Sequence, residues 1–160
     1  DPAGCGFEER RSEEGGSVSN RDEAAFALDR AAEWLQQHPE MTLGIVAPYA
    51  SQVELLRDLW RQRVVAGELP AQAKVTIHTV DGFQGQERDG MIVSMTRSNE
   101  RGEVGFLQES RRIHVAQTRA KHACMLVGDS ATLSSDSYLG WLLEYAQQME
   151  AYDSAWSWMC

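Results

Sequence analysis

The sequence lacks the Gly-x-x-x-x-Gly-Lys-Ser/Thr loop that cradles phosphates in many nucleotide-binding proteins. It contains only two lysines, Lys74 and Lys121, and neither follows a glycine-rich loop. The acidic pair Asp22 and Glu23 has the composition of a magnesium-binding motif, but such a motif follows an apolar strand. Because residues 17–21, Ser-Val-Ser-Asn-Arg, are mostly polar, we interpret this pair as the beginning of a helix. We therefore expect neither a phosphate loop nor a magnesium-binding acid in these residues.

The chain also lacks any apolar run close to the roughly 20 residues that cross a bilayer. Its first residues are polar, acidic and glycine-containing, so we expect no signal peptide and no membrane partner. The three cysteines, Cys5, Cys124 and Cys160, are odd in number and widely spaced, and no His/Cys cluster predicts a metal site. Cysteine use of this kind favours a reducing compartment, so we expect a cytoplasmic location, or a nuclear one in a eukaryote.

Positive charge is scarce as well. The chain has 15 Lys and Arg against 24 Asp and Glu, which gives a net charge of −9 over 160 residues. This balance excludes a protein that coats nucleic acid by bulk attraction, so any such binding must rest on local patches or backbone amides. With 42% hydrophobic residues, the chain is long enough for one ordinary domain with a core.

The sequence does contain an alternation of strand-like and helix-like segments. Short apolar runs alternate with stretches whose apolar residues recur at helical spacing. The expected strands are residues 41–47, 74–80, 90–95 and 123–127, and the expected helices are residues 20–38, 51–64, 107–120 and 138–149. This order predicts an α/β fold, a parallel sheet with helices on both faces.

Side chains that could cap two of these helices are present. We expect the first helix to be capped by Ser19 or Asn20. Asp22 or Glu23, three residues later, would complete a capping box. Ser51 is expected to cap the helix that follows the first strand.

Composition divides the chain into three segments. Residues 1–19 are expected to be a flexible N-terminal loop, because residues 8–16 have almost no apolar side chain. Residues 20–150 form the expected domain. Residues 151–160 are an aromatic tail that contains Trp156 and Trp158. The tail either folds back on the domain, because burying such rings is favourable, or covers a surface left by a missing neighbour.

Residues 79–87, Thr-Val-Asp-Gly-Phe-Gln-Gly-Gln-Glu, carry the first candidate site. Gly82 and Gly85 let the backbone approach a ligand closely, and the amides of such a turn suit an anion. Glu87 would be repelled by a triphosphate but can accept hydrogen bonds from sugar hydroxyls. Phe83 is expected to anchor the turn in the core. The alternative is a tight turn with a solvated glutamate.

Residues 111–121, Arg-Arg-Ile-His-Val-Ala-Gln-Thr-Arg-Ala-Lys, carry the second candidate site. Arg112 and Arg119 are seven positions apart, so they share a face of the expected helix. Two guanidinium groups on one face repel each other unless a nearby anion balances their positive charge. One alternative is a set of ordinary ion pairs with nearby acids (Glu109, Asp89 or Glu87). The other is a phosphate, which arginine binds through two parallel hydrogen bonds.

Three segments resemble, in order, the motifs of superfamily 1 helicases. Residues 45–52, Ile-Val-Ala-Pro-Tyr-Ala-Ser-Gln, resemble motif IV, residues 79–87 resemble motif V, and residues 111–121 resemble motif VI. Residues 96–99, Thr-Arg-Ser-Asn, and 105–107, Gly-Phe-Leu, match the segment between motifs V and VI. The resemblance covers most of the chain, and its branch holds the nonsense-mediated-decay RNA helicase and the immunoglobulin mu-binding helicase.

The resemblance implies the second RecA-like domain of a two-domain motor that moves 5′ to 3′ along single-stranded DNA or RNA. ATP would lie between the two domains, with ATP and Mg²⁺ held mainly by the first. By similarity, Arg119 is the arginine finger that reaches the γ-phosphate, Glu87 contacts the ribose, and Gly85 lies beside the nucleotide. Arg112 and Gln52 complete the implied ATP-binding residues. The implied nucleic-acid contacts are Thr79, Pro48, Tyr49 and Arg97.

The motifs of the first domain are absent, and we expect them upstream of Asp1 in a longer protein. The 160 residues are therefore predicted not to hydrolyse ATP alone. His114 and Gln117 stand where the family usually has Asn and an aliphatic residue, and Gly82 stands where Ala or another small residue is usual. Two other interpretations stay open: a non-catalytic binding module that kept the fold, and an unrelated parallel α/β enzyme.

Overall fold

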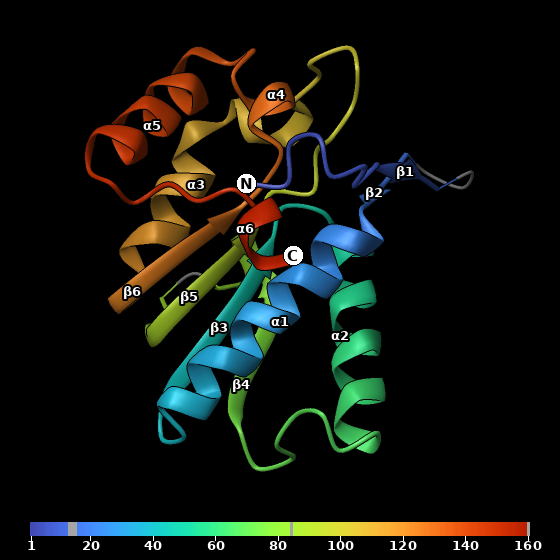
Figure 1. The fold of residues 1–160 in the computed structure, drawn as a ribbon, viewed down its shortest axis with the longest axis vertical. Coiled ribbons are helices and arrows are strands. Elements are labelled where there is room, and N and C mark those ends of the chain that lie inside the picture. The colour runs from blue at the N-terminus through green and yellow to red at the C-terminus, as the bar shows by residue number, and fades with distance from the viewer. Residues whose placement is uncertain (13–15, 84, 160) are drawn as a thin grey trace.

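The computed structural model describes residues 1–12, 16–83 and 85–159, and its centre is a parallel sheet. The strands are β3 (Thr42–Ala47), β4 (Lys74–Thr79), β5 (Arg88–Ser94) and β6 (Ala120–Val127). They lie in the order β4-β3-β5-β6, and each neighbouring pair is parallel (Figure 1). The predicted α/β fold is confirmed, and each strand agrees with its predicted range to within a few residues.

Helices cover both faces of this sheet. They are α1 (Arg21–Gln37), α2 (Ala50–Val65), α3 (Ser110–Thr118), α4 (Ser130–Leu133), α5 (Ser137–Gln148) and α6 (Trp156–Met159). Leu43 and Ile45 of β3 lie in one buried cluster with residues of α1 and α2. Val46 belongs to a second cluster, with Met91 of β5 and Ile113 of α3. Strand β3 is thus buried on both faces, as a central parallel strand should be.

The connection between β4 and β5 crosses the sheet through a tight turn. Residues 80–83, which include the 3₁₀ turn η1 (Asp81–Phe83), follow the carboxyl end of β4, and residues 85–87 precede the amino end of β5. Phe83 is 1% exposed and lies over β3, where a Cβ on Gly44 would come within 2.8 Å of its ring. Phe83 therefore anchors the turn in the core, as expected.

The predicted helix caps are partly wrong. Asn20 does cap α1, because its side-chain oxygen accepts the backbone N–H of Glu23 at 3.0 Å. Glu23 does not complete a capping box, since the Asn20 N–H donates to Gln52 Oε1 at 2.7 Å and the Glu23 side chain is buried. Ser51 lies inside α2 rather than at its cap, and its own N–H donates to Ser17 Oγ at 3.3 Å.

The helix predicted over residues 107–120 is present but divided. The 3₁₀ turn η2 (Gly105–Gln108) comes first, and α3 begins two residues after it ends. Helix α3 ends at Thr118, so Arg119 is the C-cap and Ala120 already belongs to β6. The chain becomes extended from Ala120 onward, which places Arg119 immediately before a strand.

Both chain ends lie against the domain. Strand β1 (Arg10–Arg11) pairs antiparallel with β2 (Val18–Ser19), while residues 13–15 of the expected flexible loop lie outside the described residues, as does Cys160. Helix α6 lies beside α1 in Figure 1, and the Trp158 ring is 4.2 Å from the Arg30 guanidinium carbon. The tail thus folds back on the domain, the first of the two alternatives, although Trp156 and Trp158 stay 52% and 47% exposed. None of the described helices is long and apolar enough to cross a membrane.

Candidate functional site

The amino ends of β5 and β6 bring two predicted nucleotide-binding residues together. Glu87 immediately precedes β5, and Arg119 immediately precedes β6. The backbone N–H of Arg88 donates to the Arg119 carbonyl at 3.0 Å, and Arg88 is paired with Ala120 in the sheet register. Glu87 and Arg119 therefore lie on adjoining chains at one edge of the sheet, where Glu87 is exposed and Arg119 half-buried.

The Arg119 guanidinium forms no ion pair with a carboxylate of the described residues. Its Nε is buried without a hydrogen-bond partner there, and its Nη2 is 3.5 Å from the Thr118 hydroxyl. Gly85, two residues before Glu87, has a φ of +75°, and the space that a side chain would fill there is open. A charged donor with no acidic partner, close to an open backbone turn, suits an anionic ligand.

Arg112 lies at the opposite end of α3 and is already paired. Its Nη2 lies 3.3 Å from Asp81 Oδ2 and 3.5 Å from Glu109 Oε2. Seven positions along an α-helix correspond to about 10 Å, so Arg112 and Arg119 lie near opposite ends of α3 and cannot bind the same small group. For Arg112 the structure shows ordinary ion pairs, with Glu109 as one of the predicted partners and Asp81 as an unpredicted one.

The predicted nucleic-acid contacts lie at the carboxyl edge of the sheet. Pro48 follows β3 directly and Thr79 ends β4, with Ala47 and Thr79 paired in the register. The Thr79 hydroxyl accepts the backbone N–H of Gly82 at 3.2 Å, which closes the turn that follows. A Cβ on Gly82 would collide with the His78 ring, so a larger residue at this position would require that ring to shift.

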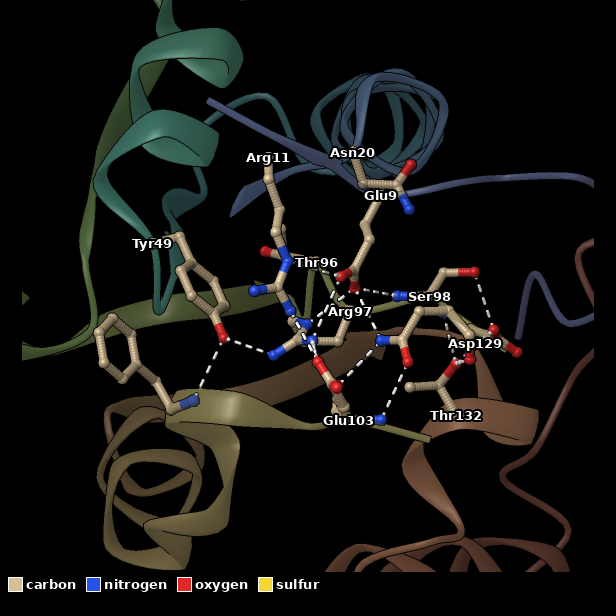
Figure 2. A network of polar contacts seen from close by, with 12 residues as sticks. Glu9, Arg11, Asn20, Tyr49, Thr96, Arg97, Ser98, Glu103, Asp129 and Thr132 are labelled. Carbon is tan, nitrogen blue, oxygen red and sulfur yellow. Dashed lines mark hydrogen bonds and ion pairs between the residues drawn. The ribbon is translucent and has the colours of Figure 1, made fainter. Parts of the chain in front are cut away.

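Tyr49 and Arg97, the other predicted nucleic-acid contacts, belong to a buried polar network (Figure 2). The Arg97 guanidinium donates to the Glu9 carboxylate at 2.7 and 3.2 Å and to the Tyr49 hydroxyl at 3.1 Å. Glu9 also accepts the Ser98 backbone N–H and the Asn99 side-chain amide, both at 3.0 Å. The side chains of Arg97 and Glu9 are only 3% and 8% exposed, so the Arg97 guanidinium binds partners within the protein.

Gln52, a predicted ATP-binding residue, is also buried. Its amide accepts the Asn20 N–H at 2.7 Å and donates to the Asn20 carbonyl at 3.0 Å and to the Ser94 hydroxyl at 2.9 Å. The Ser94 hydroxyl in turn donates to Glu23 at 2.6 Å, and Glu23 accepts the Thr96 N–H at 2.7 Å. A direct contact of Gln52 with a nucleotide would require these bonds to break. The cluster instead joins the first turns of α1 and α2 to the end of β5.

Comparison with known proteins identifies the family. A family described as an AAA domain matches residues 4–131, a stretch that includes both edges of the sheet and the buried networks. The chain belongs to this AAA domain family. Together with the relatives described next, this match confirms a helicase-type domain, the coarser part of the expectation drawn from motifs IV to VI.

The relatives of this AAA domain include named helicases. The chain is 41% identical over 137 residues to the probable helicase MAGATAMA 3 of Arabidopsis thaliana, an alignment that covers 83% of the chain and 16% of the relative. It is 35% identical over 146 residues to the DNA-binding protein SMUBP-2 of Rattus norvegicus, covering 91% and 14%. It is 30% identical over 142 residues to the uncharacterized ATP-dependent helicase MJ0104 of Methanocaldococcus jannaschii, covering 89% and 20%. The chain thus spans 14–20% of the length of these three relatives and is a helicase-type domain.

Two acidic residues that organise this AAA domain are missed by sequence reasoning. The sequence places Glu9 in an expected loop, and no local signal marks it, because its partner Arg97 is 88 positions away. Glu23 has a weak signal. It lies four and eight positions before Ala27 and Ala31, which are 0% exposed, so helical spacing puts it on the buried face of α1.

Burial gives Glu23 a titration that can be tested in this AAA domain. Its side chain is fully buried, and Oε2 has no hydrogen-bond partner among the described residues. Burial raises the pKa of Glu23 from 4.5 to about 7, against hydrogen bonds from Ser94 and Thr96 that lower it. A raised pKa means that the folded state binds this proton more tightly than the unfolded state. The free energy of unfolding should therefore fall as the pH rises from 4.5 to about 7.

We expect Glu23→Gln to remove roughly 3 kcal/mol of this pH dependence, the equivalent of the pKa shift. Urea denaturation of the wild type and the variant, from about pH 4.5 to pH 8, measures it. Asp22→Asn is the matched control, because Asp22 is the exposed neighbour of Glu23, and this variant should keep the fall in stability that Glu23 causes between pH 4.5 and about 7. Parallel profiles of the wild type and Glu23→Gln would contradict a buried carboxyl that titrates in this range.

Proposed function

We propose that this chain is the second RecA-like domain of an ATP-dependent superfamily 1 helicase that moves 5′ to 3′ along single-stranded DNA or RNA. The observation that carries the proposal is the placement of Glu87 and Arg119 at the amino edge of the sheet. Arg119 has no acidic partner among the described residues, whereas Arg97 and Arg112 are both paired with carboxylates. A half-buried guanidinium without a counter-ion is expected to receive an anion from outside the domain.

The amino edge would contact the nucleotide. Arg119 would reach the γ-phosphate of ATP, Glu87 would accept hydrogen bonds from the ribose hydroxyls, and the open turn at Gly85 would lie beside the nucleotide. The Arg119 guanidinium would stabilise the charge that develops on the transferring phosphoryl group. The triphosphate and Mg²⁺ would be held mainly by a first RecA-like domain of the same full-length protein, which supplies the phosphate loop that these 160 residues lack.

The carboxyl edge would carry the single strand. Thr79 and Pro48 would touch the nucleic-acid backbone, because Thr79 ends β4, Pro48 directly follows the neighbouring β3, and both are partly exposed. Tyr49 and Arg97 would hold the turn at Pro48 in position, since the Tyr49 hydroxyl and the Arg97 guanidinium are bonded to each other at 3.1 Å within the buried network. This division separates the nucleotide from the strand by the length of the sheet.

Two residues implied in ATP binding take different roles in this proposal. Gln52 would fix the first turns of α1 and α2, because its amide is bonded to Asn20 and Ser94. Arg112 would stabilise the carboxyl edge, because its ion pair with Asp81 links it to the turn that follows β4. Neither role requires a direct contact with ATP.

We predict that the purified 160-residue chain shows no Mg²⁺-dependent ATP hydrolysis. A catalytic arginine acts only when another domain presents the phosphates to it. Phosphate release with and without single-stranded nucleic acid tests this, and the full-length protein is the positive control. Hydrolysis by the chain alone that survives Arg119→Ala would indicate an unrelated active site. Inactivity of the full-length protein under the same conditions would favour a non-catalytic binding module.

A further inference from the structure

Phe106 has an aromatic side chain that is exposed to solvent but fixed in position by its neighbours. It lies in η2, between β5 and α3, and is 55% exposed. Its ring stacks on the Tyr49 ring, with centroids 5.0 Å apart and an interplanar angle of 22°. Its backbone N–H donates to the Tyr49 hydroxyl at 3.2 Å. Two separate contacts therefore fix the position of a ring that is not buried.

The support beneath Phe106 belongs to the buried network of Figure 2. Tyr49 is 5% exposed, and its hydroxyl accepts an N–H of the buried Arg97 at 3.1 Å. Gly105 has a φ of +56°, and a Cβ there would collide with the Arg97 guanidinium and the Tyr49 hydroxyl. Glycine thus lets the chain pass close to Tyr49 and Arg97 and present the next residue outward.

Phe106 lies between the two turns of the carboxyl edge. On one side is Tyr49, which directly follows Pro48 at the end of β3. The Arg112 guanidinium carbon is 5.2 Å from the Phe106 ring centroid, and Arg112 is paired with Asp81 in the turn after β4. The exposed Phe106 ring therefore lies on the path that we propose for the single strand.

The surroundings of the ring favour a nucleobase over a phosphate. The Arg112 guanidinium is faced by two carboxylates, Asp81 at 3.3 Å and Glu109 at 3.5 Å. A phosphate would meet this excess of negative charge, which repels it. The uncharged face of a base can instead stack on an exposed aromatic ring, whatever the base is.

We propose that Phe106 is a stacking residue for a nucleobase of the bound single strand. The proposal rests on the proposed function, because it uses the strand path along the carboxyl edge, and it adds a base contact to the backbone contacts there. Stacking tolerates every base, as a protein that moves along any sequence requires. Stacking releases no counterions, so its contribution to affinity does not depend on salt.

The test is the Kd of the full-length protein for labelled single strands of DNA and of RNA, measured by fluorescence anisotropy. Phe106→Ala is expected to raise Kd about 5- to 100-fold and to leave the slope of log Kd against log salt unchanged. Phe106→Trp keeps an aromatic ring and should retain the wild-type Kd. Trp141→Ala is the matched control, because Trp141 is a 56% exposed ring on α5, and its Kd should equal that of the wild type. A loss on DNA alone, on RNA alone or on both identifies the strand whose bases Phe106 contacts.

An abasic DNA strand of the same length separates stacking from a structural role. It keeps the phosphates and lacks the bases, so the wild type and Phe106→Ala should bind it equally. Equal losses on the normal and abasic strands would overturn the stacking role, and so would the absence of any loss on normal strands, which would favour a protein partner for this ring. Binding of neither DNA nor RNA by the wild type would refute the nucleic-acid part of the proposed function itself. Binding of both with an unchanged Kd for Phe106→Ala would refute the stacking role alone.

Discussion

Full-length protein that carries Arg119→Ala is expected to hydrolyse ATP about 10³- to 10⁵-fold more slowly than the wild type at saturating ATP. The loss should fall on kcat, because an arginine finger acts on charge that develops in the transition state. The stability of the fold should change little, since Arg119 has no acidic partner among the described residues that its removal would leave unpaired. Steady-state phosphate release measures kcat, and urea denaturation checks the fold.

Two further variants separate the role of Arg119 from a general loss of positive charge. Arg112→Ala removes the same residue type from the other end of α3, where Asp81 and Glu109 already engage it, and should lower kcat far less. Arg119→Lys keeps the charge but loses the planar fork, so it should restore little of the rate. A kcat for Arg119→Ala within about tenfold of the wild type, or equal to that of Arg112→Ala, would exclude Arg119 as the finger.

The placement of Glu87 beside Arg119 could be predicted because it follows from topology. Apolar runs such as residues 41–47 are recognisable as strands since β3 is buried on both faces, with Leu43, Ile45 and Val46 all 0% exposed. Alternation of such runs with helices predicts parallel strands whose amino ends share one edge. Glu87 and Arg119 each precede a strand, so the same reasoning brings them to that edge.

The polar networks could not be predicted, because local spacing does not show which distant group competes for a donor. Asn20 and Glu23 have the spacing of a capping box, yet Gln52, 32 positions later, takes the Asn20 N–H. Ser94, 71 positions from Glu23, donates to its carboxylate. Helical spacing alone cannot distinguish a solvated cap from a buried cluster with these partners. The same holds for Arg97, because only the fold shows that Glu9, from the N-terminal segment, binds its guanidinium.

Glu9→Ala and Arg97→Ala are each expected to lower the free energy of unfolding by about 3–5 kcal/mol, because either change leaves a buried charge without its partner. Burial alone raises the pKa of Glu9, but hydrogen bonds from Arg97, Asn99 and Ser98 outweigh it and hold the pKa below its ordinary value of 4.5. A carboxyl with a lowered pKa adds stability above that pH and loses it as the pH falls further. The difference in stability between the wild type and Glu9→Ala should therefore shrink below pH 4.5.

Urea denaturation at neutral pH measures these losses, and Arg11→Ala is the matched control. Arg11 also contacts Glu9, at 3.9 Å, and it contacts Glu103 at 2.7 Å, but its side chain is 56% exposed. Its loss should cost only about 0.2–1 kcal/mol. The double variant Glu9→Ala/Arg97→Ala should cost less than the sum of the single variants, because no unpaired charge is left in the core. Additive costs would mean that Arg97 and Glu9 act independently. Direct contact with the nucleic-acid strand would then explain the role of Arg97 better than the ion pair does.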